Sequence, residues 1–340
     1  MFNKHTLLLF VAILCISIVS GQDKPSNIGV VLCGAEFGEK KLPGNLYTDY
    51  IYPNKQEIDY FVAKGFTQFT LPFKWERVQR TLGGDLDSAE VARMKEFLAS
   101  CNNNHIKVIL TLQNFAVYNN NSKELTLGSR KLSRDLYKDF WKKMATAFSG
   151  CTNIYGYDIM NEPRNIFGRK WRKAAQAAID GIREADMSTS IIIDGENGSF
   201  AFDWPSENNK LRKLKDPADK IIYDAHCYFD FNHSGQYDNN YQTDFKTDIG
   251  IDRVKPFIKW LKKHNKQGII GEFGVPPSDK WLEAMDKFVA YLQKNGLGAN
   301  YWAAGPWWGD YALSIEPANN TDRPQMKVLG KYLKPVVITP

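Results

Sequence analysis

The chain is dominated by a series of eight short apolar segments with strand-like composition, separated by longer stretches in which apolar residues recur at helical spacing. One repeat takes roughly 39 residues on average, which is enough for a strand, a helix and their connections. No linker or low-complexity tract interrupts the series, and the repeats share spacing but not sequence. The predicted strands are Ile28–Phe37, Phe66–Phe73, Lys107–Asn114, Tyr155–Glu162, Ser190–Glu196, Ile221–Tyr228, Gln267–Gly274 and Ala299–Pro306.

Amphipathic helices are predicted between these strands. The segment Ser88–Asn102 carries apolar residues at helical spacing, and Asp87 before it is a favourable N-cap residue. The segment Ile251–His264 has one apolar face. A third helix, Trp281–Asn295, is predicted to stop before Gly296.

Eight strand–helix alternations in one chain favour a closed (β/α)8 barrel, which belongs to the α/β class. The length of 340 residues accommodates such a barrel with insertions. A doubly wound open sheet is the rival fold, but no GxGxxG motif follows the first predicted strand. We therefore predict a single (β/α)8 domain over residues 22–340.

A secretory signal is predicted at the N-terminus, over residues 1–21. Lys4 precedes an apolar run from Leu7 to Val19, and the small residue Gly21 follows. The run is too short to cross a bilayer as a helix and is typical of a cleaved signal peptide. An uncleaved membrane anchor is the alternative. We expect a secreted protein, extracellular or periplasmic, with no membrane association after cleavage.

Composition excludes several classes of partner. The formal net charge of +6 is a mild basic excess without a clustered basic face, which argues against nucleic-acid binding. A hydrophobic content of 43% with 24% charged residues argues against a disordered chain. Aromatic residues make up 13%, and Trp and Tyr are the side chains on which sugar rings stack. A polysaccharide or oligosaccharide substrate and a monomeric state are expected.

The cysteines do not predict a metal site. One of the five, Cys15, lies in the predicted signal, and the others form no CxxC pair. No His/Asp cluster has the sequence spacing of metal ligands, so neither a metal nor a cofactor is expected. The four cysteines outside the signal are Cys33, Cys101, Cys151 and Cys227. They could form one or two disulfides, but buried free thiols are expected at least for Cys33 and Cys227, which lie inside predicted strands.

Two predicted strands end in a glutamate. The fourth ends in Asn161-Glu162-Pro163, and the seventh ends in Gly271-Glu272-Phe273. A buried glutamate costs several kcal/mol unless it is paired or hydrogen-bonded, so one such residue alone would be read as structural. Two of them on nearly opposite strands, at the end of a barrel where active sites lie, favour catalysis. Their carboxyl groups would be about 5–5.5 Å apart in a retaining glycosidase.

Further polar and aromatic residues lie at the same predicted strand ends. His226 and Tyr228 end the sixth strand, where a period of two residues places them on one face. Asn161 precedes the first glutamate. Trp302, in the last strand, is predicted to supply a flat platform at the barrel mouth, with Trp307 on its rim. This gathering is difficult to explain by packing alone.

At these residues the sequence resembles glycoside hydrolase family 5, and the similarity extends over nearly the whole mature chain. It is closest to the fungal-type endo-β-1,4-glucanase branch, which has segments similar to Gly34–Phe37, Lys220–Tyr223 and Gly268–Phe273. The most specific match is the long segment Trp302–Tyr311. Asn161–Pro163 alone is weaker, because several barrel glycosidase families carry an Asn-Glu pair there.

The resemblance implies a retaining mechanism, with Glu162 as general acid/base and Glu272 as nucleophile. This chemistry requires the first carboxyl protonated and the second ionised, so we predict a raised pKa for Glu162 and a lowered one for Glu272. The other implied contacts are His226 with Glu162, Tyr228 with Glu272, Asn161 with the 2-hydroxyl of the −1 sugar, and Trp302 beneath that sugar.

Two positions depart from the family pattern. Thr70 stands where the family has an arginine that hydrogen-bonds the nucleophile, and Gln113 stands where it has a histidine that contacts the −1 sugar. Both changes fall in one subsite, which suggests a pocket shaped for a different or decorated sugar, or weakened catalysis. Without this arginine the pKa of Glu272 should rise. The alternative is that Lys74, which faces as Thr70 does, or Arg77 restores the lost charge beside Glu272.

The leading hypothesis is a secreted retaining endo-β-glycanase that hydrolyses a β-1,4-linked polysaccharide, cellulose-type glucan first. The same chemistry on mannan or on a substituted or acidic β-glycan is the alternative among enzymes. A catalytically weakened carbohydrate-binding protein is the alternative from another class, and retention of both glutamates argues against it.

Overall fold

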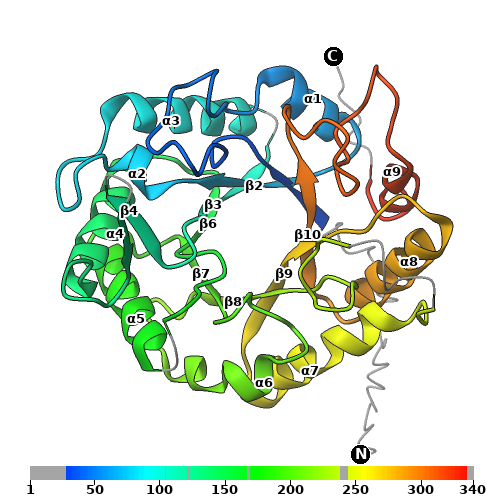
Figure 1. The fold of residues 1–340 in the computed structure, drawn as a ribbon. Coiled ribbons are helices and arrows are strands. Elements are labelled where there is room, and N and C mark those ends of the chain that lie inside the picture. Colours follow the sequence, from blue (N-terminus) through cyan, green and yellow to red (C-terminus); the bar gives the residue numbers. More distant parts are fainter. Residues whose placement is uncertain (1–27, 104, 121–122, 167–168, 238–243, 335–340) are drawn as a thin grey trace, which may run out of the picture.

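Eight parallel strands close into a barrel in the computed structural model, which describes residues 28–103, 105–120, 123–166, 169–237 and 244–334 (Figure 1). Each strand pairs with its neighbours in chain order, and the first pairs with the last to complete the ring. The predicted (β/α)8 architecture is confirmed. The barrel strands are β1 (Ile28–Leu32), β2 (Gln68–Phe73), β3 (Lys107–Leu112), β6 (Ile154–Asp158), β7 (Ser190–Asp194), β8 (Ile221–His226), β9 (Gln267–Phe273) and β10 (Gly298–Ala304).

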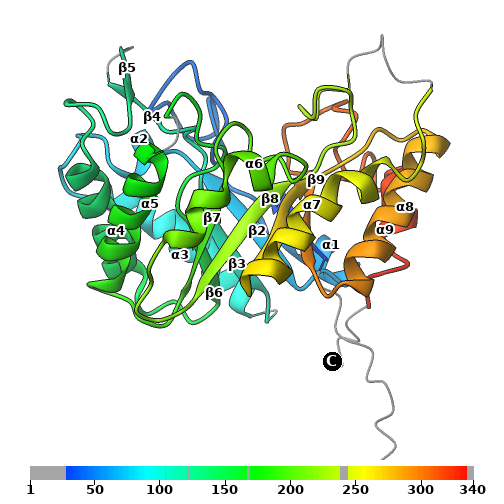
Figure 2. The ribbon, with the colours of Figure 1, turned by 90° about the horizontal axis from the view of Figure 1, so that it is seen from below.

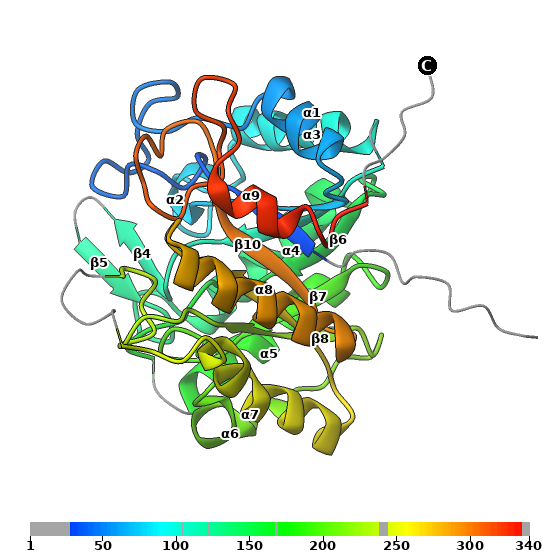
Figure 3. The ribbon, with the colours of Figure 1, turned by 90° about the vertical axis from the view of Figure 1, so that its right-hand side faces the viewer.

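Helices surround the strands, with α8 against β10 and α9 against α8 (Figure 3). The predicted helix Ser88–Asn102 is confirmed as α3, where the Asp87 carboxylate accepts from the N–H groups of Ala89 and Glu90. The other two predicted helices correspond to α7 and α8, with small shifts at their ends. The helices are α1 (Lys55–Ala63), α2 (Trp75–Val78), α3, α4 (Arg134–Phe148), α5 (Arg169–Arg183), α6 (Trp204–Glu207), η1 (Asn209–Lys213), α7 (Ile249–His264), α8 (Asp279–Lys294) and α9 (Pro324–Leu329).

The strands end earlier than predicted. β1 stops at Leu32, β6 at Asp158 and β10 at Ala304. The backbone φ angle is 39° at Glu162 and 136° at Gly305, outside the extended region, so the chain has left the sheet before these residues. Glu162 therefore projects from a loop that follows β6, and not from the strand itself.

A β-hairpin after β3 was not predicted. It consists of β4 (Val117–Asn120) and β5 (Lys123–Thr126), and Figure 2 shows it on the face of the barrel where the strands end. Tyr118 fixes it to the body, because its ring packs edge-on against Trp75 with centroids 5.5 Å apart. The hairpin is short and mostly polar, so the apolar alternation that marks a strand in sequence is missing.

The barrel interior changes from apolar to polar along its axis. One isoleucine from each of four strands contributes to a small buried apolar layer. Two positions further along each strand, where the period of two residues returns to the same face, the side chain is polar or absent. The isoleucines are Ile109, Ile192, Ile222 and Ile269, and the residues two positions on are Thr111, Asp194, Asp224 and Gly271.

The four cysteines of the predicted mature chain are free thiols. Cys33, Cys101 and Cys227 are buried, and Cys151 is partly buried. No disulfide joins any of the four. Cys15 and the predicted signal peptide, residues 1–21, lie outside the described residues. Within the described part of the chain, no helix has both the length and the apolar character needed to cross a membrane.

Candidate active site

The ends of β6, β8 and β9 bring the four predicted catalytic side chains together. His226 is the last residue of β8 and pairs in register with Glu272 of β9. Tyr228 lies two residues beyond β8, and Glu162 lies in the loop after β6. Each of the four is at most 8% exposed, so its polar atoms need partners inside the protein.

The two glutamates share one histidine. His226 Nδ1 lies 2.9 Å from Glu162 Oε1 and 3.4 Å from Glu272 Oε2. Oxygens of both carboxyl groups and this nitrogen all lie within 4.8 Å of one another. The Tyr228 hydroxyl donates to Glu272 Oε2 at 2.7 Å and restrains its rotamer. Two carboxyl groups this close suit a nucleophile and an acid/base acting on one sugar, the retaining arrangement. They leave too little room for the attacking water of an inverting enzyme.

Glu162 is held by its own loop and by a neighbouring strand. Its backbone N–H donates to Asp194 Oδ2 at 2.8 Å, which fixes the left-handed turn at this residue. The guanidinium of Arg164 donates to Glu162 Oε2. Arg164 also stacks over the ring of Phe115, 4.6 Å from its centroid, while 55% of its side chain is exposed. Arg164 was not among the residues predicted from sequence.

The protonation states differ from the prediction. Burial opposes ionisation of Glu162, but the hydrogen bond and charge of His226 and then the charge of Arg164 hold its pKa below the usual range. Burial raises the pKa of Glu272, and the Glu162 charge adds to this, while His226 and Tyr228 offset it only in part. The predicted order of the two pKa values is therefore wrong for this arrangement, because Arg164 contacts Glu162 and His226 lies nearer to Glu162 than to Glu272. The raised pKa of Glu272 is the direction predicted for a site without the arginine.

Three buried aspartates lie beneath the glutamates, and none was predicted as a site residue. Asp158, Asp194 and Asp224 are at most 4% exposed, and burial raises the pKa of each. Asp194 Oδ2 lies 3.5 Å from His226 Nε2. Asp224 accepts from the N–H of Gly271 at 2.6 Å, an approach that a Cβ at Gly271 would block. An aspartate within an otherwise apolar strand was the available sequence signal.

The predicted substrate-binding residues Asn161, Gln113 and Thr70 are all buried in the barrel mouth. Together with Glu272 they line a narrow cavity that leads from the carboxyl groups into the barrel. The backbone N–H of Asn161 donates to the carbonyl of Leu112 at 2.9 Å, which ties the loop after β6 to β3. Thr70 and Gln113, the two departures from the family pattern, therefore line one cavity with the glutamate of β9.

Neither candidate for restoring the missing positive charge reaches Glu272. Lys74 Nζ donates to the carbonyl of Gln113 at 2.6 Å and lies 3.4 Å from Glu39. Arg77 donates to backbone carbonyl groups of the loop that follows β1. The alternative that one of them substitutes for the arginine is therefore wrong. Strand alternation gave the facing of Lys74 but not the direction of its long side chain.

The predicted aromatic residues lie within β10, as Trp302 does, or directly after it, as Trp307 does. Trp302 is partly buried, and its indole N–H donates to the Tyr311 hydroxyl at 3.2 Å. Trp308 packs between Phe37 and Tyr311, with centroid distances of 4.9 and 4.5 Å, and so closes this side of the barrel. Trp307 is 41% exposed. Trp302 and Trp307 thus have open ring surface on the side of the molecule where the strands end.

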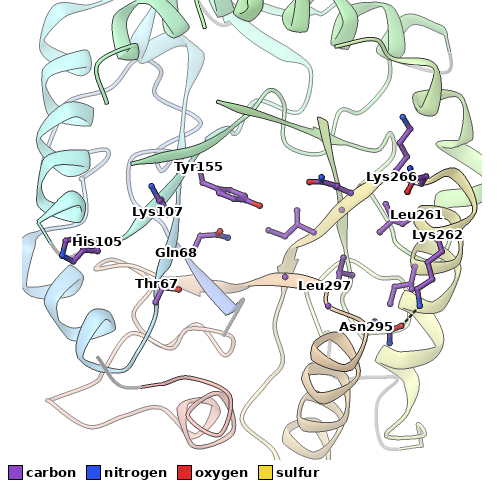
Figure 4. Close-up of a pocket in the computed structure, with 17 residues that line it drawn as sticks. Thr67, Gln68, His105, Lys107, Tyr155, Leu261, Lys262, Lys266, Asn295 and Leu297 are labelled. Atoms are coloured by element: carbon purple, nitrogen blue, oxygen red, sulfur yellow. Dashed lines mark hydrogen bonds between the residues drawn. The ribbon is translucent and has the colours of Figure 1, made fainter. Parts of the chain in front are cut away.

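A second cavity, of about 670 Å³, lies at the opposite end of the barrel (Figure 4). It is lined by residues at the starts of strands, among them Gln68, Lys107 and Tyr155, and by Lys262 and Lys266. Its lining contains lysines and amides but no carboxylate, so it lacks the acid pair that glycoside hydrolysis requires. None of the predicted site residues lies there.

Two groups of described residues have the proximity of metal ligands, which sequence spacing did not predict. Glu162, His226 and Glu272 form one group, and Asp194, Asp224 and His226 form the other, with ligand atoms within 4.8 Å of one another. They come from different strands, so ligand spacing along the chain could not reveal them. Catalysis by paired carboxylates accounts for the first group without a metal.

Comparison with known proteins gives the family. The model of the cellulase family, glycosyl hydrolase family 5, matches residues 32–307. This chain belongs to glycosyl hydrolase family 5. It is 34% identical to endo-beta-1,4-glucanase B of Emericella nidulans over 86% of each chain, and 35% identical to the probable endo-beta-1,4-glucanase B of Aspergillus oryzae over 90% of each.

Solved structures agree with this family. Endoglucanase Cel5A of Pseudomonas stutzeri, in complex with cellobiose, superposes with a TM-score of 0.86 at 40% identity, covering 92% of this chain and 93% of its own. The family is the one suggested by the resemblance in sequence, and this member is a retaining glycoside hydrolase. The family assignment does not by itself give roles to individual residues.

Proposed function

We propose that this glycosyl hydrolase family 5 member is an endo-β-1,4-glucanase with Glu272 as nucleophile and Glu162 as general acid/base. The observation that carries the proposal is that the two carboxyl groups share His226, at 2.9 and 3.4 Å. The fungal relatives are named as endo-beta-1,4-glucanases, which supports a glucan substrate.

In the first step Glu272 attacks the anomeric carbon, and the leaving oxygen takes the proton of Glu162. In the second step Glu162 accepts a proton from water as that water displaces Glu272. Tyr228 holds the attacking carboxylate in place through its hydroxyl. Asn161 and Gln113, which line one cavity with Glu272, bind hydroxyl groups of the −1 sugar. Trp302 lies beneath that sugar.

Glu162 needs a proton at the moment of attack, although Arg164 and His226 favour its ionised form. More than half of the Arg164 side chain is exposed, so its contact with Glu162 lies at the open side of the site. We propose that the leaving-group sugar displaces Arg164 from Glu162. This displacement removes a positive charge and allows the carboxyl group to hold its proton.

The test of the mechanism is the configuration of the first product. Proton NMR of early turnovers on a cello-oligosaccharide should show the β-anomer before mutarotation, as a double displacement requires. Early α-anomer would refute the roles given to the two glutamates. Internal cleavage is tested separately, by a rapid fall in the viscosity of soluble cellulose relative to the release of reducing ends.

Mannan, or a substituted or acidic β-glycan, is a second candidate substrate, favoured by Thr70 and Gln113 in the −1 pocket. Release of reducing sugar from a panel of these polysaccharides separates the candidates. Activity on none of them, with retained binding, would favour a carbohydrate-binding protein. Export is proposed from the apolar run Leu7–Val19, and N-terminal sequencing of the protein from culture medium tests the predicted cleavage.

A further inference from the structure

A small cavity inside the barrel lies beneath Glu272. Four of its lining residues, Thr70, Thr111, Asp158 and Asp224, come from β2, β3, β6 and β8, so the site has oxygen atoms from four strands around it. The volume open to the centre of a water-sized sphere is about 10 Å³, which is room for one such sphere. The cavity therefore fits a single small occupant.

Three lining oxygens point to an occupant. Thr70 Oγ1, Thr111 Oγ1 and Asp158 Oδ1 have no hydrogen-bond partner among the described residues, and the three side chains are between 3% and 5% exposed. Thr111 Oγ1 lies near the Asp158 carboxyl group but does not meet the geometry of a hydrogen bond with it. Buried polar atoms are almost always partnered, so three orphans around one cavity indicate a bound species.

The lining of the cavity is rich in oxygen atoms of the kind that bind a cation. The carboxyl groups of Asp158, Asp224 and Glu272 line it, and Asp194 lies just behind His226. Among the described residues, His226 is the one basic side chain in the lining, beside the amides of Asn161, Gln113 and Asn300. Hard cations take oxygen ligands, and a ring of neutral oxygens can replace the hydration shell of potassium.

Thr70 lies in the lining of this cavity and brings no positive charge to it. Neither Lys74 nor Arg77 is among the residues that line the cavity, and both donate to backbone carbonyl groups. We propose that the cavity binds one monovalent cation of about the size of water, potassium or ammonium, held by Thr70, Thr111 and Asp158. Binding is independent of the proposed function, whereas an effect of the ion on the rate, through Glu272, rests on it.

Binding is tested first on the wild-type protein without substrate. Thermal unfolding is followed by tryptophan fluorescence in potassium, ammonium, sodium and choline chloride at one ionic strength. A saturable rise in Tm with potassium or ammonium, absent with choline, is expected. In crystals grown with rubidium chloride, an anomalous peak is expected between the two threonine hydroxyls and Asp158. Equal Tm values in all salts, or a peak without anomalous signal, which indicates water, would overturn the proposal.

Two substitutions at one position sharpen the test. Thr70→Val keeps the shape and removes a ligand, so the potassium-dependent rise in Tm should shrink at least about threefold. Thr70→Arg carries its own charge and should make Tm independent of potassium. Thr126→Val, in β5 and away from the cavity, is the control and should respond as the wild type does. A full response in Thr70→Arg would contradict the site.

The rate effect separates this inference from the proposed function. Potassium should raise kcat/KM on the active polysaccharide several-fold relative to choline, and the rise should disappear in Thr70→Arg. Should no polysaccharide be cleaved while Tm still responds to potassium, the cation site stands and the proposed function fails. Thr111→Val provides a second ligand deletion in case Thr70→Val does not fold, and the rubidium experiment requires no variant.

Discussion

The two ends of the barrel interior differ in chemistry although the same strands build both. Towards the strand starts, Ile109, Ile192, Ile222 and Ile269 fill the barrel with an apolar layer. Towards the strand ends, buried carboxyl groups and one histidine occupy the same face two to four residues later. The apolar layer stabilises the barrel, whereas the polar layer places groups where burial is costly and chemistry is possible.

Substitution of the two glutamates should give the largest effect, a loss of activity without a loss of stability. Glu272→Ala and Glu162→Ala should each lower kcat on the order of 10⁴-fold or more, because each removes a reacting group. Their Tm values should stay near that of the wild type, since a buried carboxyl group is removed and not an apolar contact. Azide should partly restore Glu162→Ala on an activated aryl substrate, where Glu162 is needed only as the base of the second step. Wild-type activity in Glu272→Ala would refute the assignment.

The opposite pattern is expected in the apolar layer. Ile192→Ala should lower the free energy of unfolding by roughly 2–5 kcal/mol, because Ile192 is fully buried and a cavity remains. The kcat of the folded fraction should hardly change. Urea unfolding monitored by tryptophan fluorescence measures the loss, and Ile192→Val is the matched control, at about 0.5–1.5 kcal/mol. Loss of kcat without loss of stability would show that the two layers are not separable.

Tyr228 tests how the polar layer positions the nucleophile. Tyr228→Phe keeps the ring and removes a hydrogen bond of 2.7 Å to Glu272, which should cost roughly 1.5–3 kcal/mol in transition-state stabilisation. The effect should fall on kcat more than on KM, because the hydroxyl contacts the carboxylate and not the sugar. Steady-state kinetics on a soluble glucan measures how the effect divides between kcat and KM. A change confined to KM would place Tyr228 in substrate binding instead.

Trp302 lies at the mouth of the barrel, beside the polar layer. Trp302→Ala should lower kcat/KM by the equivalent of roughly 1–3 kcal/mol if its ring lies beneath the −1 sugar. Trp308→Ala is the control, because Trp308 packs against Phe37 and Tyr311 and its loss should reduce stability more than catalysis. An unchanged kcat/KM in Trp302→Ala would make it a packing residue.

Arg164 should give the smallest effect, a shift along the pH axis. Its positive charge holds the pKa of Glu162 low, so Arg164→Met should raise that pKa. The general acid must be protonated, so the basic limb of kcat/KM should move to higher pH in the variant. Arg164→Lys keeps a charge and should move it less. A shift to lower pH would contradict the contact between Arg164 and Glu162.

Much of the fold and the identity of the site residues could be predicted because they depend on local pattern. Strand-like segments at a regular spacing favoured a barrel, and the glutamates at the ends of two predicted strands located its mouth. Strand ends were less predictable, since the left-handed turn at Glu162 depends on a hydrogen bond from its N–H to Asp194, a residue of the next strand. The hairpin of β4 and β5 lacks the apolar alternation by which a strand is recognised.

The amino-acid sequence by itself determined the barrel, the family and the two glutamates, because these follow from periodicity and from short motifs. Only the tertiary structure decided which charges face one another. It directs His226 towards both glutamates, sends Lys74 to a backbone carbonyl, and stacks three aspartates beneath the site. These outcomes depend on side-chain directions across strands that are distant in the chain, and electrostatic interactions change steeply over such distances inside a protein.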